Sequence, residues 1–352
     1  MSKKEKLIIF AGLLLTIISG ILHYTHANPV ITFMVVAGAL AVVAMIVGDA
    51  TEQLGSKLGP GATGILQSGL GNLPELFVCI FALRAGLDHV VKAALIGSIL
   101  GNSLLVFGAA LFFGGLKNGR QVFKSEPPKL ISILMLLAFA AMAIPTLAVE
   151  MKTPAATHID TLDIFLAIVL LVLLASSIFF SIKGDKSLAP KPQEHTAHDS
   201  WSMPLTIIVL ALAGVCAAFV SDWFVEALQP AMGTLGINET FAGLVVVAIA
   251  GNAIENVIGI QLAIKNNADY AVSVILNSSL QVALGLYPIL VLLSFILGGA
   301  ILSFVLSPIL LAAFALAVIT SAFIVFDGES IWLEGLALIG LYCLIAAAFW
   351  WG

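Results

Sequence analysis

The sequence predicts an all-α, polytopic membrane protein with about eleven transmembrane helices, arranged as two inverted five-helix repeats plus a leading helix. Of its 352 residues, 61% are hydrophobic and only 10% are charged, far below the roughly 25% charge of soluble domains. The apolar runs have the length of about 20 residues that an α-helix needs to cross the bilayer, and they lack the alternating period of a β-barrel. A Gly-Asn-x-x-Glu motif occurs twice, at residues 71–75 and 251–255.

The predicted spans are apolar runs bounded by charged residues, Pro or Gly. The first run follows a charged start that resembles a signal peptide, but no clean small-residue cleavage site follows it, so we keep it as a span. In chain order the spans are 7–23, 30–49, 61–84, 90–115, 129–149, 161–183, 203–226, 240–264, 270–296, 303–326 and 330–351.

The basic residues predict the orientation of these spans. With a cytoplasmic N-terminus, twelve of the fifteen Lys and Arg residues fall on the cytoplasmic side, and only Arg84, Lys92 and Lys152 fall outside. Cytoplasmic loops carry an excess of Lys and Arg, so the number of spans and their orientation support each other. The compact loops predict the plasma membrane of a prokaryote, with a vacuolar membrane as the alternative.

One long polar stretch, residues 184–202, divides the chain into two halves. A shift of 180 positions places the first Gly-Asn-x-x-Glu motif on the second. Each half contains five spans, an odd number, so the second half must cross the membrane upside down relative to the first. The predicted parts are a leading helix (1–28), a first repeat (29–183), a cytoplasmic linker (184–202) and a second, inverted repeat (203–352).

Two intramembrane carboxylates, Glu75 and Glu255, are the strongest functional candidates. A carboxylate at bilayer depth costs roughly 3 kcal/mol on insertion scales, and such residues are functional by default. In the first copy, Asn72 and Glu75 lie on one helical face, and Pro74 removes a backbone donor that the helix would use. In the second copy Ile254 replaces the proline, which predicts a milder break in that helix.

Polar residues in the following spans extend this set into a candidate cation site. Carboxylate and carbonyl oxygens suit a hard cation, and six to eight of them in a flexible cage favour Ca²⁺ over Mg²⁺. His is absent from these faces and Cys79 is the only Cys, which argues against zinc or copper. Any single Ser or Asn here has the alternative role of a hydrogen bond between helices. The predicted cation- and proton-binding residues are Glu75, Glu255, Asn72, Asn252, Gly71, Gly251, Ser98, Asn102, Ser278 and Gln281, with Glu75 and Glu255 as the metal ligands.

These motifs resemble the calcium/proton exchangers of the calcium/cation antiporter superfamily. The first Gly-Asn-x-x-Glu is followed by Gly-Ser-x-x-x-Asn at 97–102, and the second by Ser-x-x-Gln at 278–281. The resemblance implies a ten-helix core that exchanges cytosolic Ca²⁺ for protons by alternating access, with the two glutamates as shared carriers. Asn277 stands where the family usually has Gly, and Asn256 where it often has His, so gating near both positions is left open.

Three other functions fit the sequence less well. Sodium-coupled exchangers of the same superfamily carry Thr-Ser hydroxyls ahead of the acid, where this chain has Gly-Asn. An ion channel usually repeats its filter around a pore, and an intramembrane hydrolase would use a carboxylate dyad that these Glu and Asn pairs do not resemble. We therefore expect a non-enzymatic transporter without a cofactor or nucleic-acid partner. Stoichiometry, selectivity over Mn²⁺ and Cd²⁺, the stable access state and homo-oligomerisation stay open.

Overall fold

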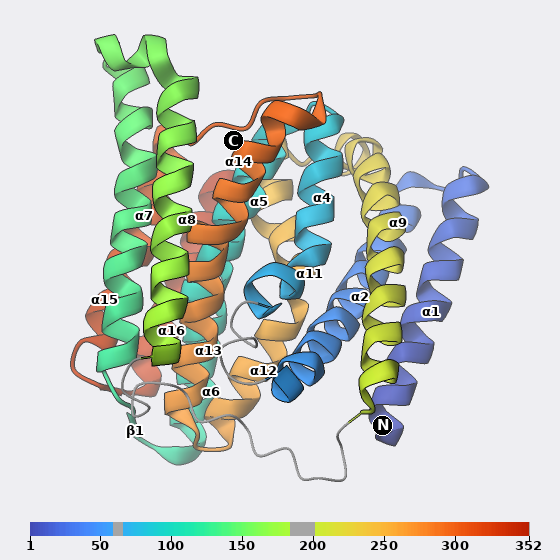
Figure 1. Cartoon of the computed structure of the whole chain (residues 1–352), viewed down its shortest axis with the longest axis horizontal. Helices are drawn as coiled ribbons and strands as arrows, with labels where there is room; N and C mark the ends of the chain where they lie inside the picture. The colour runs from blue at the N-terminus through green and yellow to red at the C-terminus, as the bar shows by residue number, and fades with distance from the viewer. Residues whose placement is uncertain (59–65, 184–200, 352) are drawn as a thin grey trace.

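The computed structural model describes residues 1–58, 66–183 and 201–351, and these form a bundle of helices (Figure 1). Helix α1 (Lys3–Tyr24) precedes the two halves. The first half contains α2 (Pro29–Leu58), η1 (Gln67–Gly71), α4 (Leu73–Arg84), α5 (Asp88–Leu100), η2 (Gly101–Val106), α6 (Phe107–Asn118), β1 (Gln121–Val122), α7 (Glu126–Glu150), η3 (Pro154–His158) and α8 (Ile159–Lys183). The second contains α9 (Met203–Leu235), α10 (Glu239–Phe241), η4 (Ala242–Val247), α11 (Ala248–Gly251), α12 (Ala253–Ile264), α13 (Ala268–Gln281), η5 (Val282–Leu286), α14 (Tyr287–Leu297), α15 (Pro308–Val325), β2 (Glu329–Ser330) and α16 (Trp332–Trp350).

Nine helices within the described residues are long and apolar enough to cross a membrane. The two predicted spans missing from these nine, 61–84 and 240–264, are the two that carry the Gly-Asn-x-x-Glu motifs. Each is interrupted within its motif, so neither contains one long helix. Nine uninterrupted and two interrupted segments are consistent with the eleven predicted spans.

The two interruptions have the same backbone conformation. Asn72 has φ −95° and ψ 17°, and Asn252 has φ −106° and ψ 26°, both in the sparsely populated bridge region where many active-site residues lie. The milder second break expected from Ile254 is therefore wrong. Pro74 lies in the first turn of α4, where a missing N–H leaves no helical bond unmade, so the proline does not cause the break.

The two halves pack on each other in reciprocal pairs. Helix α4 packs against α9 and α14 of the second half, and α12 packs against α2 and α6 of the first. Because α2 corresponds to α9 and α6 to α14 in chain order, each contact recurs with the halves exchanged. This reciprocity fits two inverted repeats. Helices α2 and α9, which correspond to each other, lie side by side in the bundle (Figure 1).

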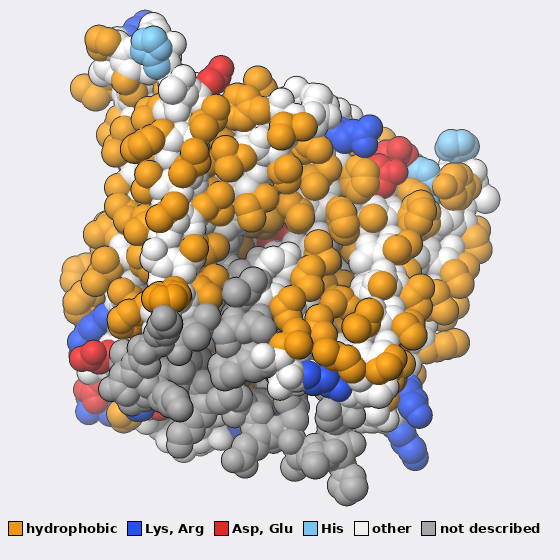
Figure 2. Space-filling model, viewed as in Figure 1, with side chains coloured by type: hydrophobic (Ala, Val, Ile, Leu, Met, Phe, Trp, Pro, Cys, Tyr) orange, Lys and Arg blue, Asp and Glu red, His pale blue; other side chains and the backbone are white. Residues whose placement is uncertain are grey.

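The outer surface has the polarity of a bilayer-spanning bundle. Hydrophobic side chains cover the visible faces of the helices, while charged side chains gather toward the two ends (Figure 2). The N- and C-termini lie at opposite ends of the bundle (Figure 1), as an odd number of spans requires. The protein is thus an all-α membrane protein, as the sequence predicts.

The predicted span 303–326 is wrong at its beginning. Helix α15 starts at Pro308, and residues 298–307 contain no helix. Gly298 and Gly299 have φ values of +65° and +156°, which L-residues with side chains rarely adopt, and burial then alternates along the segment, with Leu302 and Phe304 both 0% exposed. A short apolar run has the same hydropathy whether it is extended or helical, which explains the error.

Two other spans are longer than predicted. Helix α2 continues to Leu58 and α9 to Leu235, past the predicted ends at 49 and 226. Asp49 and Glu226 suggested span ends, but both lie inside continuous helices. Charged residues near a helix end therefore mark where the membrane-spanning part ends, and the helix itself continues beyond them.

Gly243 allows η4 to approach α5 closely, which provides a test of the packing between halves. A Cβ at Gly243 would lie 2.4 Å from the Val90 carbonyl oxygen and 2.8 Å from the Ala93 Cβ. We expect Gly243→Ala to destabilise the protein by about 1–3 kcal/mol through overpacking, seen as a lower thermal unfolding midpoint in detergent. Gly38→Ala is the control, because a Cβ there meets no heavy atom within 4 Å. Equal midpoints for the two variants would contradict this packing.

Candidate cation site

Both Gly-Asn-x-x-Glu motifs lie where a helix restarts after an interruption. Asn72 directly precedes α4 and Glu75 lies in its first turn, and Asn252 likewise precedes α12. A helix N-terminus carries a positive partial charge that stabilises a nearby carboxylate. A Cβ on Gly251 would lie 3.7 Å from both the Cβ and the Cγ of Glu75. The backbone of the second motif is therefore in contact with the acidic side chain of the first.

A chain of hydrogen bonds joins polar side chains of the two halves. Ser98 Oγ, from α5, donates to Glu75 Oε1, and Asn252 Nδ2 donates to Ser98 Oγ at 2.8 Å. Asn102 Nδ2, from η2, contacts Asn252 Oδ1 at 3.5 Å and Ser278 Oγ at 3.1 Å. Five predicted site residues, three from the first half and two from the second, are thus connected. Residues up to 203 positions apart in the sequence meet in one cluster (278 − 75).

This cluster is buried and partly unsatisfied. The exposed fraction is 2% for Glu75, 1% for Asn102 and 7% for Asn72. Buried polar groups normally have a hydrogen-bond partner, yet Asn102 Oδ1 and Asn72 Nδ2 have none within the described part of the chain. An amide carbonyl oxygen without a donor, close to a buried carboxylate, is a ligand suited to a hard cation.

The remaining predicted site residues lie around this cluster. Gly71 is the last residue of η1, directly before the first interruption, and Gln281 is buried at the end of α13, about one turn beyond Ser278. The backbone of Glu255 lies in the first turn of α12, but its side chain is outside the described part of the structure. Its role as second carboxylate stays a prediction. Among described residues no group of three or more His, Cys, Asp or Glu could hold a metal.

Three serines outside the predicted site residues support the site. Ser103 and Ser279 share a hydrogen bond between their hydroxyls at 2.9 Å, joining η2 to α13. Ser221 Oγ of α9 donates to the Pro74 carbonyl oxygen at 3.3 Å, which fixes the start of α4. The only sequence signal for the first pair was that each serine directly follows a predicted site residue.

Comparisons with known proteins bear on this arrangement. A family model described as "Sodium/calcium exchanger protein" matches residues 28–183 and 205–351. The chain is 34% identical to a Ca²⁺/H⁺ antiporter of Aphanothece halophytica, over 97% of this chain and 96% of that one. It is 33% identical to the Ca²⁺/H⁺ antiporter ChaA of Bacillus subtilis, over 97% of both chains. It also matches the solved structure of native YfkE with a TM-score of 0.83 and 31% identity, covering 99% of this chain and 100% of that one.

The Asn102 carbonyl oxygen, which has no hydrogen-bond donor among the described residues, provides a test of cation binding. A bound cation raises the thermal unfolding midpoint by mass action, so a Ca²⁺ titration of this midpoint in detergent measures its affinity. We expect Asn102→Ala to raise the half-saturating Ca²⁺ concentration roughly tenfold, the effect of losing about 1.4 kcal/mol of binding free energy. Ser103→Ala is the matched control, because it removes a neighbouring buried polar group whose hydroxyl bonds Ser279. Coinciding titration curves for Asn102→Ala and the unchanged protein would refute the assignment of Asn102 as a ligand.

Proposed function

The chain belongs to the sodium/calcium exchanger protein family, and we propose that it exchanges Ca²⁺ for protons across a membrane by alternating access. The observation that carries this proposal is the buried carboxylate of Glu75, which contacts groups from both halves at an interrupted helix. Proton coupling, in preference to sodium coupling, is supported by the full-length relatives, which are named Ca²⁺/H⁺ antiporters.

Competition between Ca²⁺ and protons follows from the charge of the site. Burial disfavours an ionised carboxylate, and a second carboxylate close by disfavours it further. In our proposal protons therefore neutralise Glu75 and Glu255 when no cation is bound. A bound divalent cation reverses this preference and displaces the protons. The same oxygens therefore hold either Ca²⁺ or protons, but not both.

Obligatory exchange follows from the cost of an empty site. Either one Ca²⁺ or two protons neutralises two carboxylates, which allows the site to be enclosed while it changes sides. An empty, doubly charged site would remain buried without compensation, at a cost of several kcal/mol per ion. The empty site therefore cannot return to the other side of the membrane, and each Ca²⁺ that leaves must be replaced by protons.

The neighbouring polar residues have distinct roles in this scheme. Asn102 would supply a carbonyl ligand, since its Oδ1 lacks a donor within the described residues. Ser98 donates to Glu75 Oε1, which stabilises the carboxylate after a proton leaves. Asn252 holds Ser98 in place. We assign Asn72, Gly71, Gly251, Ser278 and Gln281 to the lining of the site.

The proposed setting is the plasma membrane of a prokaryote, with the N-terminus in the cytoplasm. The distribution of basic residues supports this orientation, because only Arg84, Lys92 and Lys152 fall at the opposite end. Two of the relatives described above are bacterial. In this orientation the protein would export Ca²⁺ in exchange for entering protons, and residues 29–183 and 203–352 would be the two inverted repeats.

Loss of either glutamate charge is expected to abolish exchange. Glu75→Gln and Glu255→Gln keep the side-chain shape but cannot release a proton or neutralise Ca²⁺, so ⁴⁵Ca²⁺ uptake into proteoliposomes should fall by at least about a hundredfold, the usual scale for removing an essential charged group. Glu239→Gln, a change in the first turn of the short helix α10, is the control and should retain uptake. Robust uptake by a folded Glu75→Gln or Glu255→Gln protein would eliminate the proposed mechanism.

Coupling to protons is expected to persist without sodium. Proteoliposomes with an acidic interior, diluted into alkaline sodium-free buffer, should accumulate ⁴⁵Ca²⁺, and nigericin with K⁺ should abolish the uptake by collapsing the pH gradient. Because protons occupy the same carboxylates, acidifying the side that presents Ca²⁺ should raise the half-saturating Ca²⁺ concentration, by roughly tenfold per pH unit for each proton displaced. Uptake that requires a Na⁺ gradient and ignores the pH gradient would favour sodium coupling.

A further inference from the structure

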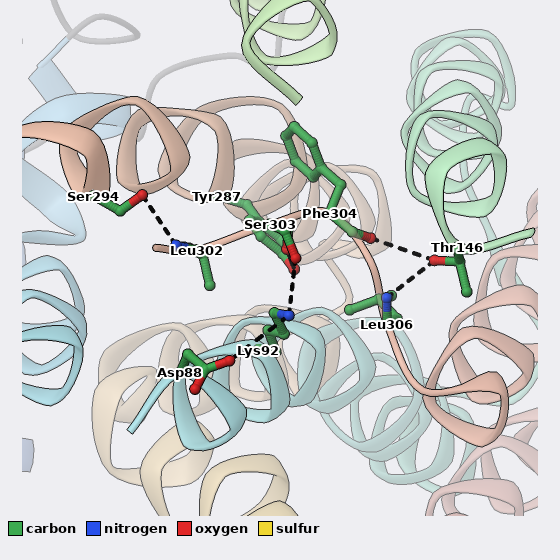
Figure 3. A network of polar contacts seen from close by, with 9 residues as sticks. All are labelled: Asp88, Lys92, Thr146, Tyr287, Ser294, Leu302, Ser303, Phe304 and Leu306. Carbon is green, nitrogen blue, oxygen red and sulfur yellow. Dashed lines mark hydrogen bonds and ion pairs between the residues drawn. The ribbon is translucent and has the colours of Figure 1, made fainter. Parts of the chain in front are cut away.

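An extended segment crosses the end of the bundle that carries Arg84, between α14 and α15. We call residues 302–306 the outer strap. Its residues Leu302, Phe304 and Leu306 are at most 3% exposed, so the strap runs through the protein interior (Figure 3). Non-helical backbone at such a position persists only where protein groups bind its N–H and C=O groups.

Side chains from several helices bind the strap backbone. The Leu302 N–H donates to Ser294 Oγ of α14 at 3.0 Å, and the Leu306 N–H donates to Thr146 Oγ1 of α7 at 3.0 Å. The Ser303 carbonyl oxygen accepts from the Tyr287 hydroxyl at 3.0 Å (Figure 3). The strap backbone is therefore held by separate hydrogen bonds to side chains, and not by the continuous hydrogen-bond ladder of a β-sheet.

Lys92 is a charged group that contacts the strap. Its Nζ donates to Ser303 Oγ at 3.0 Å and lies 3.8 Å from Asp88 Oδ2, and its side chain is only 13% exposed (Figure 3). Asp163 of α8 is 1% exposed and interacts electrostatically with Lys92 and with the backbone of Phe304. A largely buried ammonium group beside a carboxylate is stable only while its neighbours stay in place.

The strap is connected to both helices of the first half that form the site. Lys92 lies on α5 six residues before Ser98, a distance of about 9 Å along a helix. The Ala300 N–H, just before the strap, donates to the Leu83 carbonyl oxygen at the end of α4 at 3.0 Å. Helix α4 carries Glu75, so both site helices are tied to a connector of the second half.

The corresponding connector at the other end of the bundle is fixed differently. There Gln121 and Val122 pair as a strand with Ser330 and Glu329, and Gln121 Nε2 donates to the Ala263 carbonyl oxygen of α12 at 3.2 Å. The outer strap has no strand partner among the described residues. Its position therefore depends on polar side chains, and Lys92 supplies the only ammonium group among the contacts described for it.

We propose that Lys92 is a positioning residue that keeps the outer end of the ion path closed, by fixing α5 to the outer strap across the two halves. The assignment of this end as the outer one rests on the proposed function and its orientation. Cys79, which lies on α4 between Glu75 and Arg84, is 0% exposed, so the arrangement described here is closed on the outer side. Opening that end would separate Lys92 from Ser303. Loss of the Lys92 contacts shifts the protein toward the outward-open state.

Cys79 provides a native reporter of this closure. It lies on α4 about one turn beyond Glu75, is 0% exposed, and belongs to the same buried cluster as Tyr287 and Phe304. In a Cys216→Ala, Cys343→Ser background, a membrane-impermeant thiol reagent added outside intact cells reacts with Cys79 only when the outer end opens. We expect Lys92→Met to raise this labelling rate about tenfold, the shift expected on losing a charged hydrogen bond.

Three further variants give the measurement its controls. Lys92→Arg retains the charge and the donor and should restore slow labelling, whereas Lys152→Met removes an exposed lysine at the same end and should change nothing. Ser303→Ala removes only the acceptor hydroxyl and should raise the labelling rate about threefold, near the lower end of the range for losing one hydrogen bond. If Lys92→Met does not fold, the Ser303→Ala result tests the proposal. Unchanged labelling in a folded Lys92→Met protein, or in Ser303→Ala where that protein does not fold, overturns the proposal. Labelling requires no transport, so its outcome is independent of whether Ca²⁺/H⁺ exchange is found.

Discussion

The burial of one carboxylate, Glu75, is the constraint on which much of the remaining structure depends. An ionised carboxylate within a bilayer-spanning bundle is stable only with hydrogen-bond donors and a countercharge close by. Ser98 supplies a donor, Asn252 from the other half holds that serine, and the α4 N-terminus supplies a partial positive charge. The partial positive charge lies beside Glu75 only because α4 begins at Leu73, so the break at Asn72 contributes to the site.

Close approach of the two halves is the second requirement. The hydrogen bond between Ser98 and Asn252 crosses the interface between them, so short side chains can meet only if the backbones nearly touch. At Gly97, next to Ser98, a Cβ would lie 2.2 Å from the Leu244 carbonyl oxygen, and the same contact region includes Gly243. Small residues at such crossings are the usual way in which membrane helices approach closely. The π-helical turns η2 and η5, which carry or directly follow Asn102 and Gln281, add the local irregularity often found at functional sites.

Side chains satisfy irregular backbone at two places in the described part of the chain. At the second motif break Asn252 Nδ2 donates to the Ala248 carbonyl oxygen, and at the outer strap Thr146, Tyr287 and Ser294 bind backbone groups. The strap joins the ends of both site helices of the first half to the second half. In the proposed mechanism a change of access at the site is accompanied by movement at this connector, because packed helices transmit displacement to the groups fixed to their ends.

The sequence by itself determined the membrane class, the repeat and the family, because hydropathy, charge distribution and the duplicated motif are local or periodic properties. It also predicted Glu75, Ser98 and Asn102 as site residues, since polar residues in apolar helices are visible without coordinates. Only the tertiary structure decided which of them touch, that the break falls equally at Asn72 and Asn252, and that residues 302–306 are extended. These features depend on contacts between residues far apart in the chain, where partners from other helices, absent from any local pattern, determine whether a backbone group is satisfied.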